Sequence, residues 1–597
     1  MTWKCSRGQT TVIVFLSCFL VLAVGCTKKQ DIKAEEVVKV QAVMESVSTD
    51  KAAYNPGESV KFTLQLKLAE TGSKVRVQYR HLGKIIGNDE HELDRQQIEW
   101  SWEPPTDDGK GYMAEVFIVS KDGVTDHLNI GVDISSDWAK FPRYGYLADF
   151  PSMSKEEITK VIDRLNRFHI NGIQFYDWQY KHHEPIKMDA DKPAAQWNDI
   201  ANRPVALETV NNYIELAHDR NMKAMNYNLL FGAYENADKE GVKKEWGLFK
   251  GPAQTNQDKH PLPDSWASDI MLYDPQNTEW QDYLIGKEVE VFKLLPFDGW
   301  HVDQLGDRGS LWNAASKKVR LPEGYVSFLK AAKQKLDVDY VMNAVGQYGQ
   351  AFLAAGAPLD FLYTEVWSGH PKYRSLKEII DQNSKFSKNQ LNTVLAGYMN
   401  YDLSNSPGEF NTPGVLLTDA VIFASGGSHL ELGENMLSKE YFPHKNLSIP
   451  LELEEQLIRY YDFLVAYQNV LRDGMEESEL QAEGSGNIGI STDAEQGKIW
   501  SFAKRKNGID IVHFINFLDA TTMEWNDAAG TQAEPSEQRD IAISFQSDRK
   551  VSEILFASPD YYNGSPVQLQ YEEKDGKVTL KLPRLKYWDM ITVNYEK

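Results

Sequence analysis

The chain has 597 residues, of which 42% are hydrophobic, so it is long enough for about three to five globular domains with sizeable cores. Its 86 Asp and Glu residues outnumber the 64 Lys and Arg residues and give a net charge of -22. Nucleic acids and acidic polymers are therefore disfavoured as partners, because they require a basic surface, whereas a neutral substrate such as a sugar is compatible.

The first 25 residues are predicted to be a lipoprotein signal peptide. Lys4 and Arg7 precede an apolar run at residues 11–24, which is too short for a membrane-spanning helix but suits a signal peptide. Small residues then precede Cys26, as in a bacterial lipobox; an ordinary signal peptide with an incidental cysteine is the alternative. We expect Cys26 to carry lipid, palmitate included, and to anchor the protein in a bacterial membrane, the outer membrane being favoured, at its periplasmic or outer face.

The next segment, residues 26–40, is polar and is predicted to be a tether. Residues 41–136 show short alternating strands separated by turns, which predicts an immunoglobulin-like β-sandwich. The strands expected there are residues 41–47, 60–66, 74–79 and 112–119. This part could bind sugar, but a role as a spacer that braces the following domain is favoured.

Residues 137–475 alternate strands with helices, which predicts parallel βαβ units. The first helix is marked by Ser154 and Glu157, which have capping-box spacing. Eight strands are expected, at residues 144–149, 172–178, 223–231, 299–305, 340–346, 360–367, 392–399 and 420–429. This number is typical of a (β/α)8 TIM barrel; a doubly wound sheet is the alternative, and no Gly-rich dinucleotide or phosphate loop follows a strand.

An amphipathic helix is expected at residues 450–473, and short strands return from residue 476 to residue 597. Asn507 and Gly508 mark a hairpin turn before a strand at residues 509–517. We therefore predict a C-terminal β-sandwich over residues 476–597. The fold class is multidomain, with a TIM barrel between two β-sandwiches.

The active site of such a barrel lies at the carboxyl ends of the strands, so polar residues there are the candidates. They are mostly carboxylates and amides: Asp149, Asp177, His182, His183, Glu184, Asn226, Asn228, Asp303, Gln304, Asp307, Asn343, Gln347, Glu365, His429, Glu431 and Glu434. Thiol nucleophiles are excluded, because the three cysteines all lie in the first 26 residues. The G-x-S-x-G and H-E-x-x-H motifs are also absent, and no cofactor or metal is expected.

The adjacent histidines, His182 and His183, would point to opposite sides of an extended chain. A metal site there is disfavoured; one histidine is expected to bind substrate and the other to be structural. Aromatic rings near the strand ends could stack on sugar rings, although core packing explains any one of them. These candidates are Trp178, Trp246, Trp266, Trp300, Trp312 and Trp367.

Paired carboxylates among amides and aromatic rings suit glycoside hydrolysis, in which one attacks the anomeric carbon and the other protonates the leaving oxygen. Asp303 shares a strand face with His301, but which face is interior stays open, and capping of the next helix is the alternative role. Glu365 ends an apolar strand, where Tyr363 and Trp367 would desolvate it and raise its pKa. A buried ion pair is the alternative for Glu365.

Four segments resemble glycoside hydrolase family 66, which contains endo-dextranases and cycloisomaltooligosaccharide glucanotransferases: QFYDW (174–178), DGWHVDQLG (298–306), YTEVW (363–367) and GENMLSKEYFP (433–443). The resemblance implies a retaining mechanism with Asp303 as nucleophile and Glu365 as acid/base, and a further important carboxylate at Asp177. The predicted substrate-binding residues are Asp177, His182, Asn228, Gln304, Trp367 and Glu434.

Cyclising members of that family carry a carbohydrate-binding module inserted in the barrel. About 20 residues separate the expected seventh and eighth strands, and no other barrel loop has room for a module. We therefore predict an endo-dextranase that cleaves internal α-1,6 bonds of dextran to isomaltooligosaccharides. The alternatives are a cyclising or other transglucosylase, or a non-catalytic surface glycan-binding lipoprotein, against which the intact Asp303 and Glu365 argue.

Overall fold

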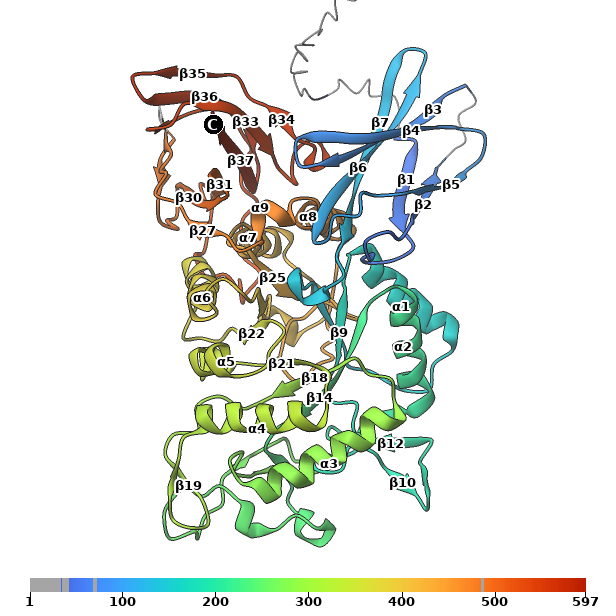
Figure 1. The fold of residues 1–597 in the computed structure, drawn as a ribbon, viewed down its shortest axis with the longest axis vertical. Coiled ribbons are helices and arrows are strands. Elements are labelled where there is room, and N and C mark those ends of the chain that lie inside the picture. The colour runs from blue at the N-terminus through green and yellow to red at the C-terminus, as the bar shows by residue number, and fades with distance from the viewer. Residues whose placement is uncertain (1–33, 35–41, 68–71, 485–487, 597) are drawn as a thin grey trace, which may run out of the picture.

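The computed structural model describes residues 34, 42–67, 72–484 and 488–596 (Figure 1). The predicted signal peptide, Cys26 and nearly all of the tether lie outside the described residues. Within the described part, no helix is both long and apolar enough to span a membrane.

Two antiparallel sheets form the N-terminal part, with strand orders β1-β2-β5 and β4-β3-β6-β7. Alternate side chains of β2, from Val60 to Leu66, are buried in an apolar core shared by these strands, as the sequence pattern predicts. The strand bounds are β1 (Met44–Thr49), β2 (Val60–Leu66), β3 (Lys74–His81), β4 (Lys84–Glu92), β5 (Gln97–Trp102), β6 (Lys110–Ser120) and β7 (Gly123–Ile134).

Parallel strands follow, each with a helix after it in the chain. The strands are β8 (Tyr144–Leu147), β9 (Gly172–Phe175), β14 (Lys223–Leu229), β18 (Gly299–Asp303), β21 (Asp339–Met342), β22 (Leu362–Glu365), β23 (Thr393–Ala396) and β25 (Gly427–Leu430). The helices are α1 (Lys155–Arg167), α2 (Leu207–Asp219), α3 (Thr278–Leu294), α4 (Leu321–Lys335), α5 (Gln350–Gly356), α6 (Tyr373–Phe386), α7 (Thr412–Ala424) and α8 (Leu451–Ala466).

These parallel strands form two hydrogen-bonded sheets, β21-β18-β14-β9-β8 and β22-β23-β25. Backbone contacts join the sheets at both edges: Ala344 N donates to Tyr363 O at 3.1 Å, and Tyr146 N donates to Leu432 O at 3.1 Å. All the carboxyl ends of the strands therefore face the same side.

Two predictions from local sequence patterns, the start of the first helix and the last expected strand, had different outcomes. The capping box of α1 is confirmed, because Ser154 N donates to the Glu157 carboxylate at 2.9 Å and Glu157 N donates to Ser154 Oγ at 3.3 Å. The strand expected at residues 420–429 was wrong in its first half, since α7 runs to Ala424 and β25 begins at Gly427. Residues 414–424 are buried all round, so no period distinguishes a helix from a strand there.

The C-terminal part contains two further sheets, one built on β27-β30-β31-β37-β33-β34 and one with the order β28-β32-β36-β35. Their short strands are β27 (Glu476–Glu477), β28 (Glu483–Gly484) and β34 (Val567–Gln568). The hairpin turn is confirmed, because Asn507 and Gly508 have φ of 50° and 80° and Lys506 pairs with Ile509. The main strands are β30 (Ile499–Lys506), β31 (Ile509–Asn516), β32 (Gln538–Gln546), β33 (Val551–Ala557), β35 (Tyr571–Lys574), β36 (Lys577–Leu585) and β37 (Trp588–Tyr595).

The N-terminal and C-terminal sheets lie side by side at one end of the molecule, beyond α7, α8 and the short α9 (Gln468–Leu471) (Figure 1). Asn129 Nδ2 of β7 donates to the carbonyl oxygen of Asn563 at 2.8 Å. The long connection after β14, residues 230–277, carries β15 (Gly232–Tyr234), β16 (Lys259–His260) and β17 (Ile270–Leu272).

Candidate active site

A cavity of about 300 Å³ opens at the carboxyl ends of the parallel strands. Tyr227 on β14, Asp303 on β18 and Glu365 on β22 line it, together with Asn343 and Tyr398 in the connections after β21 and β23. Its aromatic lining also includes Tyr176, Trp266, Tyr363, Trp367, Tyr441 and Phe442. The structure therefore brings the two main predicted carboxylates into one cavity.

One amide nitrogen connects Asp303 and Glu365. Asn343 Nδ2 donates to Asp303 Oδ1 at 2.9 Å and to Glu365 Oε2 at 3.0 Å. The remaining oxygen of each carboxylate accepts from a phenol, Asp303 from Tyr227 at 2.6 Å and Glu365 from Tyr398. Both carboxyl groups are thus fixed in orientation by neutral donors, and no cation of the described residues is paired with either.

The carboxyl groups of Asp303 and Glu365 are buried, and burial raises the pKa of both. Desolvation raises the pKa of Glu365 to about 7; the nearby charge of Asp303 adds to the rise, and hydrogen bonds from Tyr398 and Asn343 oppose it. Desolvation also raises the pKa of Asp303, against hydrogen bonds from Tyr227, the Gln304 backbone and Asn343. Glu365 therefore has a proton to give near neutral pH, as a general acid needs.

Asp177 lines the same cavity in the turn after β9, with a left-handed φ of 50°. Burial raises its pKa to about 7, although the opposite charge of Arg203 acts to lower it. Arg203 is itself held by Asp199, with Nε 2.7 Å from Oδ2. A third titratable carboxyl group thus faces the cavity beside the main pair.

The structure decides which face of β18 is interior. His301 and Asp303 line the cavity, whereas Trp300 is buried on the other face, near Phe328 and Tyr340. The parallel register pairs Tyr227 with His301, so Tyr227 also faces inward.

The same register corrects the prediction for Asn228, which does not line the cavity. Its Nδ2 donates to Glu288 Oε1 at 2.6 Å, and Asn226 Nδ2 donates to Glu288 Oε2 at 2.7 Å. Both asparagines of β14 therefore point towards α3, and direct substrate contact by Asn228 does not fit this placement. The alternation of the strand was recognised, but sequence alone did not decide which set of residues faced inward.

The adjacent histidines diverge. His182 lines the cavity, and its Nδ1 lies 2.9 Å from both Asn228 Oδ1 and Gln179 Nε2. Burial lowers its pKa to about 4, so it is neutral at pH 7. His183 instead contacts Glu240 Oε2 at 2.7 Å.

The remaining predicted binding residues separate into two groups. Trp367 and Gln304 line the cavity, but the Gln304 carboxamide is engaged by Gly306 N at 2.6 Å and by the Asn343 carbonyl at 3.2 Å. Glu434 lies outside the lining and accepts from Ala148 N at 2.8 Å and from Asp149 N at 3.0 Å. Glu434 therefore organises the connection after β8 rather than contacting a ligand in the cavity.

Among the six tryptophan candidates, Trp266 and Trp367 line the cavity. Three others are buried in apolar cores, which agrees with the alternative role of core packing: Trp178, Trp246 and Trp300. Trp312 lies on β19 (Leu311–Trp312), outside the cavity lining.

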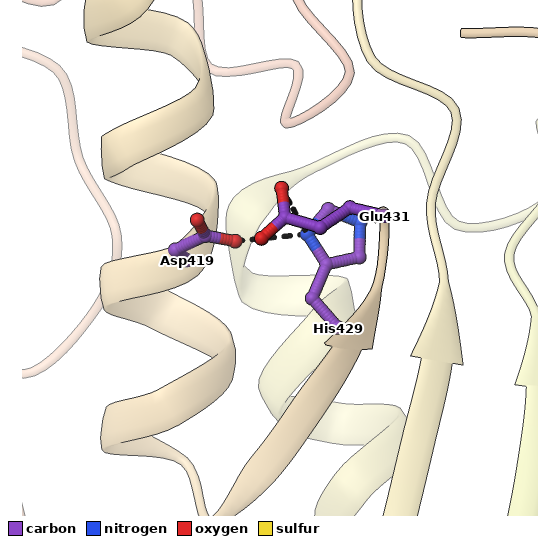
Figure 2. A group of neighbouring side chains, drawn as sticks. All are labelled: Asp419, His429 and Glu431. Atoms are coloured by element: carbon purple, nitrogen blue, oxygen red, sulfur yellow. Dashed lines mark hydrogen bonds and ion pairs between the residues drawn. The ribbon is translucent and has the colours of Figure 1, made fainter. Parts of the chain in front are cut away.

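A group of three buried side chains near β25 could offer one ligand atom each to a metal ion: Asp419, His429 and Glu431 (Figure 2). His429 Nδ1 lies 2.8 Å from Asp419 Oδ1 and 3.4 Å from Glu431 Oε2. Its Nε2 lies 3.1 Å from the Gly397 carbonyl oxygen, so both ring nitrogens of His429 contact protein oxygen atoms. None of the three lines the cavity, which corrects the candidacy of His429 and Glu431 as residues of the barrel mouth.

The sequence reasoning missed the phenols that hold the carboxylates. Tyr227 had only a partial signal, its alternation with Asn226 and Asn228; the register that pairs it with His301 of β18 comes from the structure. Tyr398 follows the end of β23, and its phenol is neither a carboxylate nor an amide, the two groups that mark the other candidates at strand ends.

A model of glycosyl hydrolase family 66 matches residues 49–592. A cycloisomaltooligosaccharide glucanotransferase of Niallia circulans is 26% identical over 704 residues, covering 92% of this chain and 71% of the relative. A dextranase of Streptococcus salivarius is 24% identical over 626 residues, covering 87% and 72%.

A solved structure shares this multidomain, sheet-rich fold. It is a Paenibacillus sp. cycloisomaltooligosaccharide glucanotransferase complexed with cycloisomaltoheptaose, with a TM-score of 0.86 and 25% identity. The match covers 92% of this chain and 99% of that chain. The family prediction made from the four sequence segments is confirmed.

Proposed function

We propose that this chain, which belongs to glycosyl hydrolase family 66, is a retaining endo-dextranase that hydrolyses internal α-1,6-glucosidic bonds of dextran to isomaltooligosaccharides. The observation that carries the proposal is the bridge from Asn343 to Asp303 and Glu365. Because one nitrogen reaches both, the two acceptor oxygens lie within about 6 Å, below the ~6.5–9.5 Å carboxyl separation of inverting enzymes and near the ~5–5.5 Å of retaining ones.

The chemistry follows from the two environments. Asp303 attacks the anomeric carbon while the bond to the leaving glucan oxygen breaks, and that oxygen takes the proton of Glu365. The glucosyl ester on Asp303 is then attacked by water, whose proton returns to Glu365, and Asp303 leaves as a carboxylate. Net retention results from these two displacements.

The competing function is cyclisation, in which the end of the same glucan replaces water. The match to the glucanotransferase spans 704 positions, more than the 597 residues of this chain, so that relative carries substantial insertions. The match to the dextranase spans 626 positions. The longest connection after a parallel strand here, residues 230–277, holds only short strands and 3-10 turns, which favours hydrolysis.

The test is incubation of the purified protein with dextran, followed by separation of linear from cyclic products and NMR detection of the first anomer released. We expect linear isomaltooligosaccharides with retained configuration. Asp303→Asn should lower turnover by at least about 10⁴-fold, because the nucleophile is lost. Asp307→Asn is the matched control, since Asp307 is exposed outside the cavity and should leave activity unchanged.

Two outcomes contradict the proposal. Cyclic products as the main species would assign the chain to the glucanotransferases. Full activity of Asp303→Asn would remove Asp303 from the nucleophile role, whatever the products.

The proposed architecture is a (β/α)8 barrel formed by the two parallel sheets and their helices. The backbone contacts Ala344–Tyr363 and Tyr146–Leu432, which join the two sheets at both edges, support closure. A flanking β-sandwich on each side, at residues 41–136 and 476–597, completes the proposed layout.

We also propose that the protein is attached to a bacterial membrane through lipidated Cys26. The support is the sequence alone: an apolar run at residues 11–24 that ends in small residues before this cysteine. Cells expressing the wild type should incorporate labelled palmitate into the protein, and Cys26→Ala should abolish the labelling. Equal labelling of both would contradict the anchor.

A further inference from the structure

Four side chains that line the catalytic cavity form a contiguous cluster beyond the strand ends: His260, Trp266, Arg308 and Tyr441. They come from the connections after β14, β18 and β25. His260 Nε2 lies 3.1 Å from the Tyr441 hydroxyl, and the ring centroids of Trp266 and Tyr441 are 5.1 Å apart in an edge-on contact. We call these four residues the outer cluster, because each lies past the end of the parallel strand that precedes it.

Arg308 of the outer cluster is held rigidly by one edge of its guanidinium group. Its Nε donates to Asp258 Oδ2 at 3.0 Å, and its Nη2 donates to Asp258 Oδ1 at 2.8 Å. Nη2 also donates to the carbonyl oxygen of Lys259 at 2.9 Å, next to His260 in the chain. Asp258 is only 2% exposed, so this bidentate pair fixes the plane of the guanidinium group before any ligand binds.

The third nitrogen of this group, Nη1, is left for a ligand. It has no hydrogen-bond partner among the described residues, and it is not one of their buried atoms. The Arg308 side chain as a whole is 16% exposed and lines the cavity. Because Asp258 already balances its charge, the guanidinium group can donate from Nη1 to a neutral acceptor without bringing an unpaired charge to it.

The rest of the outer cluster suits a sugar rather than an anion. Tyr441 is 37% exposed and Trp266 is half-buried, so both rings offer apolar surface to the cavity. Such surface packs against the C–H side of a sugar ring, while a fixed N–H group reaches its hydroxyl oxygen atoms. Glu440 lines the cavity next to Tyr441 in the chain and would repel an anion.

We propose that the outer cluster is a glucosyl-binding subsite, in which Arg308 Nη1 donates to a hydroxyl oxygen of a sugar ring that packs on Trp266. Arg308 is then a substrate-binding residue, and Asp258 is its positioning residue. The sugar would belong to the α-1,6-glucan of the proposed function, on which this inference rests. No bond changes in this subsite, so its contacts are equal in the ground and transition states, and their loss raises KM rather than lowering kcat.

The test is calorimetric titration of the full chain carrying Asp303→Asn, which prevents turnover, with isomaltohexaose. Adding Arg308→Gln should raise Kd about tenfold, through loss of a hydrogen bond from a charged donor. Asp258→Asn should also raise Kd, and the combination of both should be no weaker than Arg308→Gln alone, because one residue acts through the other. Arg320→Gln is the matched control, since Arg320 is 65% exposed outside the cavity lining and should leave Kd unchanged.

The same substitution in the active protein separates binding from chemistry. Arg308→Gln should raise KM for isomaltohexaose about tenfold and leave kcat within about twofold. A fall in kcat with unchanged KM would contradict a binding role for Arg308.

Three outcomes would overturn the subsite: no saturable binding of isomaltohexaose, equal Kd with and without Arg308→Gln, and an equal loss of affinity in Arg320→Gln. If Arg308→Gln does not fold, Arg308→Lys decides, because it keeps a cation beside Asp258 but lacks the planar fork, and unchanged affinity then contradicts the subsite. Dextran hydrolysis by the wild type is measured in parallel. Its absence would contradict the proposed function, while the comparison of Kd values still decides the subsite.

Discussion

Each of the two proposed catalytic carboxyl groups accepts a hydrogen bond from one tyrosine, and this bond has opposite consequences for their two roles. Tyr227 donates to Asp303, which must be ionised to attack, and Tyr398 donates to Glu365, which must be protonated to act as the acid. Each hydrogen bond favours the ionised form and so lowers the pKa of its carboxyl group. Tyr227 thereby assists its partner, whereas Tyr398 orients Glu365 at some expense of its proton affinity.

We predict that kcat/KM is bell-shaped in pH and falls as the pH rises past about 7, where Glu365 loses its proton. Tyr398→Phe should move this basic limb upward by about 1–2 pH units, because a hydrogen bond to a charged group is worth about 1.5–3 kcal/mol. Tyr227→Phe should move the acidic limb upward by a similar amount, because Asp303 then ionises less readily. The measurement is kcat/KM on a soluble isomaltooligosaccharide across the pH range.

The pair of variants serves as its own control, since each should leave the other limb in place. Movement of both limbs in one variant, or downward movement of either, would contradict the assigned roles. If a variant lost kcat while both limbs of its pH profile stayed in place, the phenol would position the carboxyl group without changing its pKa.

At this scale the sequence revealed Asp303, Glu365 and Asn343 but not the phenols of Tyr227 and Tyr398. A carboxylate at the end of an apolar strand is conspicuous because it has no solvent-facing reason to be there. Asn228 was misplaced because alternation defines two faces without saying which is interior. Hydrogen bonding between β14 and β18 decides this, since it pairs Tyr227 with His301.

At the scale of elements, the connection at residues 230–277 supplies one wall of the catalytic cavity. Trp266 lies on it half-buried, with its ring centroid 5.1 Å from that of Tyr441 in an edge-on contact. His260 from the same connection lies 3.1 Å from the Tyr441 hydroxyl. Two connections distant in sequence thus meet at one aromatic surface.

We predict that Trp266→Ala raises KM for isomaltooligosaccharides by about 2- to 10-fold with little change in kcat, because an aromatic contact is worth about 0.5–1.5 kcal/mol in both ground and transition states. Trp312→Ala is the control, being half-buried outside the cavity, and should leave KM unchanged. A fall in kcat alone would place Trp266 in the chemistry rather than in binding.

A helix or strand could be predicted from the sequence where its buried residues recurred with a regular period or a capping motif marked its start. The helix at α1 had both, and β2 alternated cleanly. The helix α7 has a cap, since Asn411 Oδ1 accepts from Gly414 N at 2.9 Å, but it has no period, because residues 414–424 are buried on every side between strands and other helices. Its identity depends on tertiary packing, which a sequence pattern does not contain.

At the scale of the whole molecule, the N-terminal sheets pack closely on the helices that follow the last parallel strand. Gly131 N of β7 donates to Asp462 Oδ1 of α8 at 2.9 Å. The same carboxylate pairs with Arg167 at 2.9 Å and contacts His169 at 2.7 Å. One buried aspartate therefore links the N-terminal sheet, α8 and the end of α1, a connection that no local sequence signal marked.

This contact requires a residue without a side chain, which leads to a prediction for the whole molecule. A Cβ at Gly131 would lie 2.7 Å from the Asp462 carbonyl oxygen and 2.9 Å from Val465 Cβ, so Gly131→Ala must push β7 away from α8. We expect it to lower the free energy of unfolding by about 1–3 kcal/mol, the usual cost of overpacking. Gly286→Ala on α3 is the control, since a Cβ there meets nothing within 4 Å and should stabilise by up to about 1 kcal/mol. Urea denaturation compares the two, and equal stability of both variants would show that β7 and α8 do not pack this closely. Limited proteolysis adds the location, because loosening should expose the N-terminal sheet to cleavage before the parallel strands.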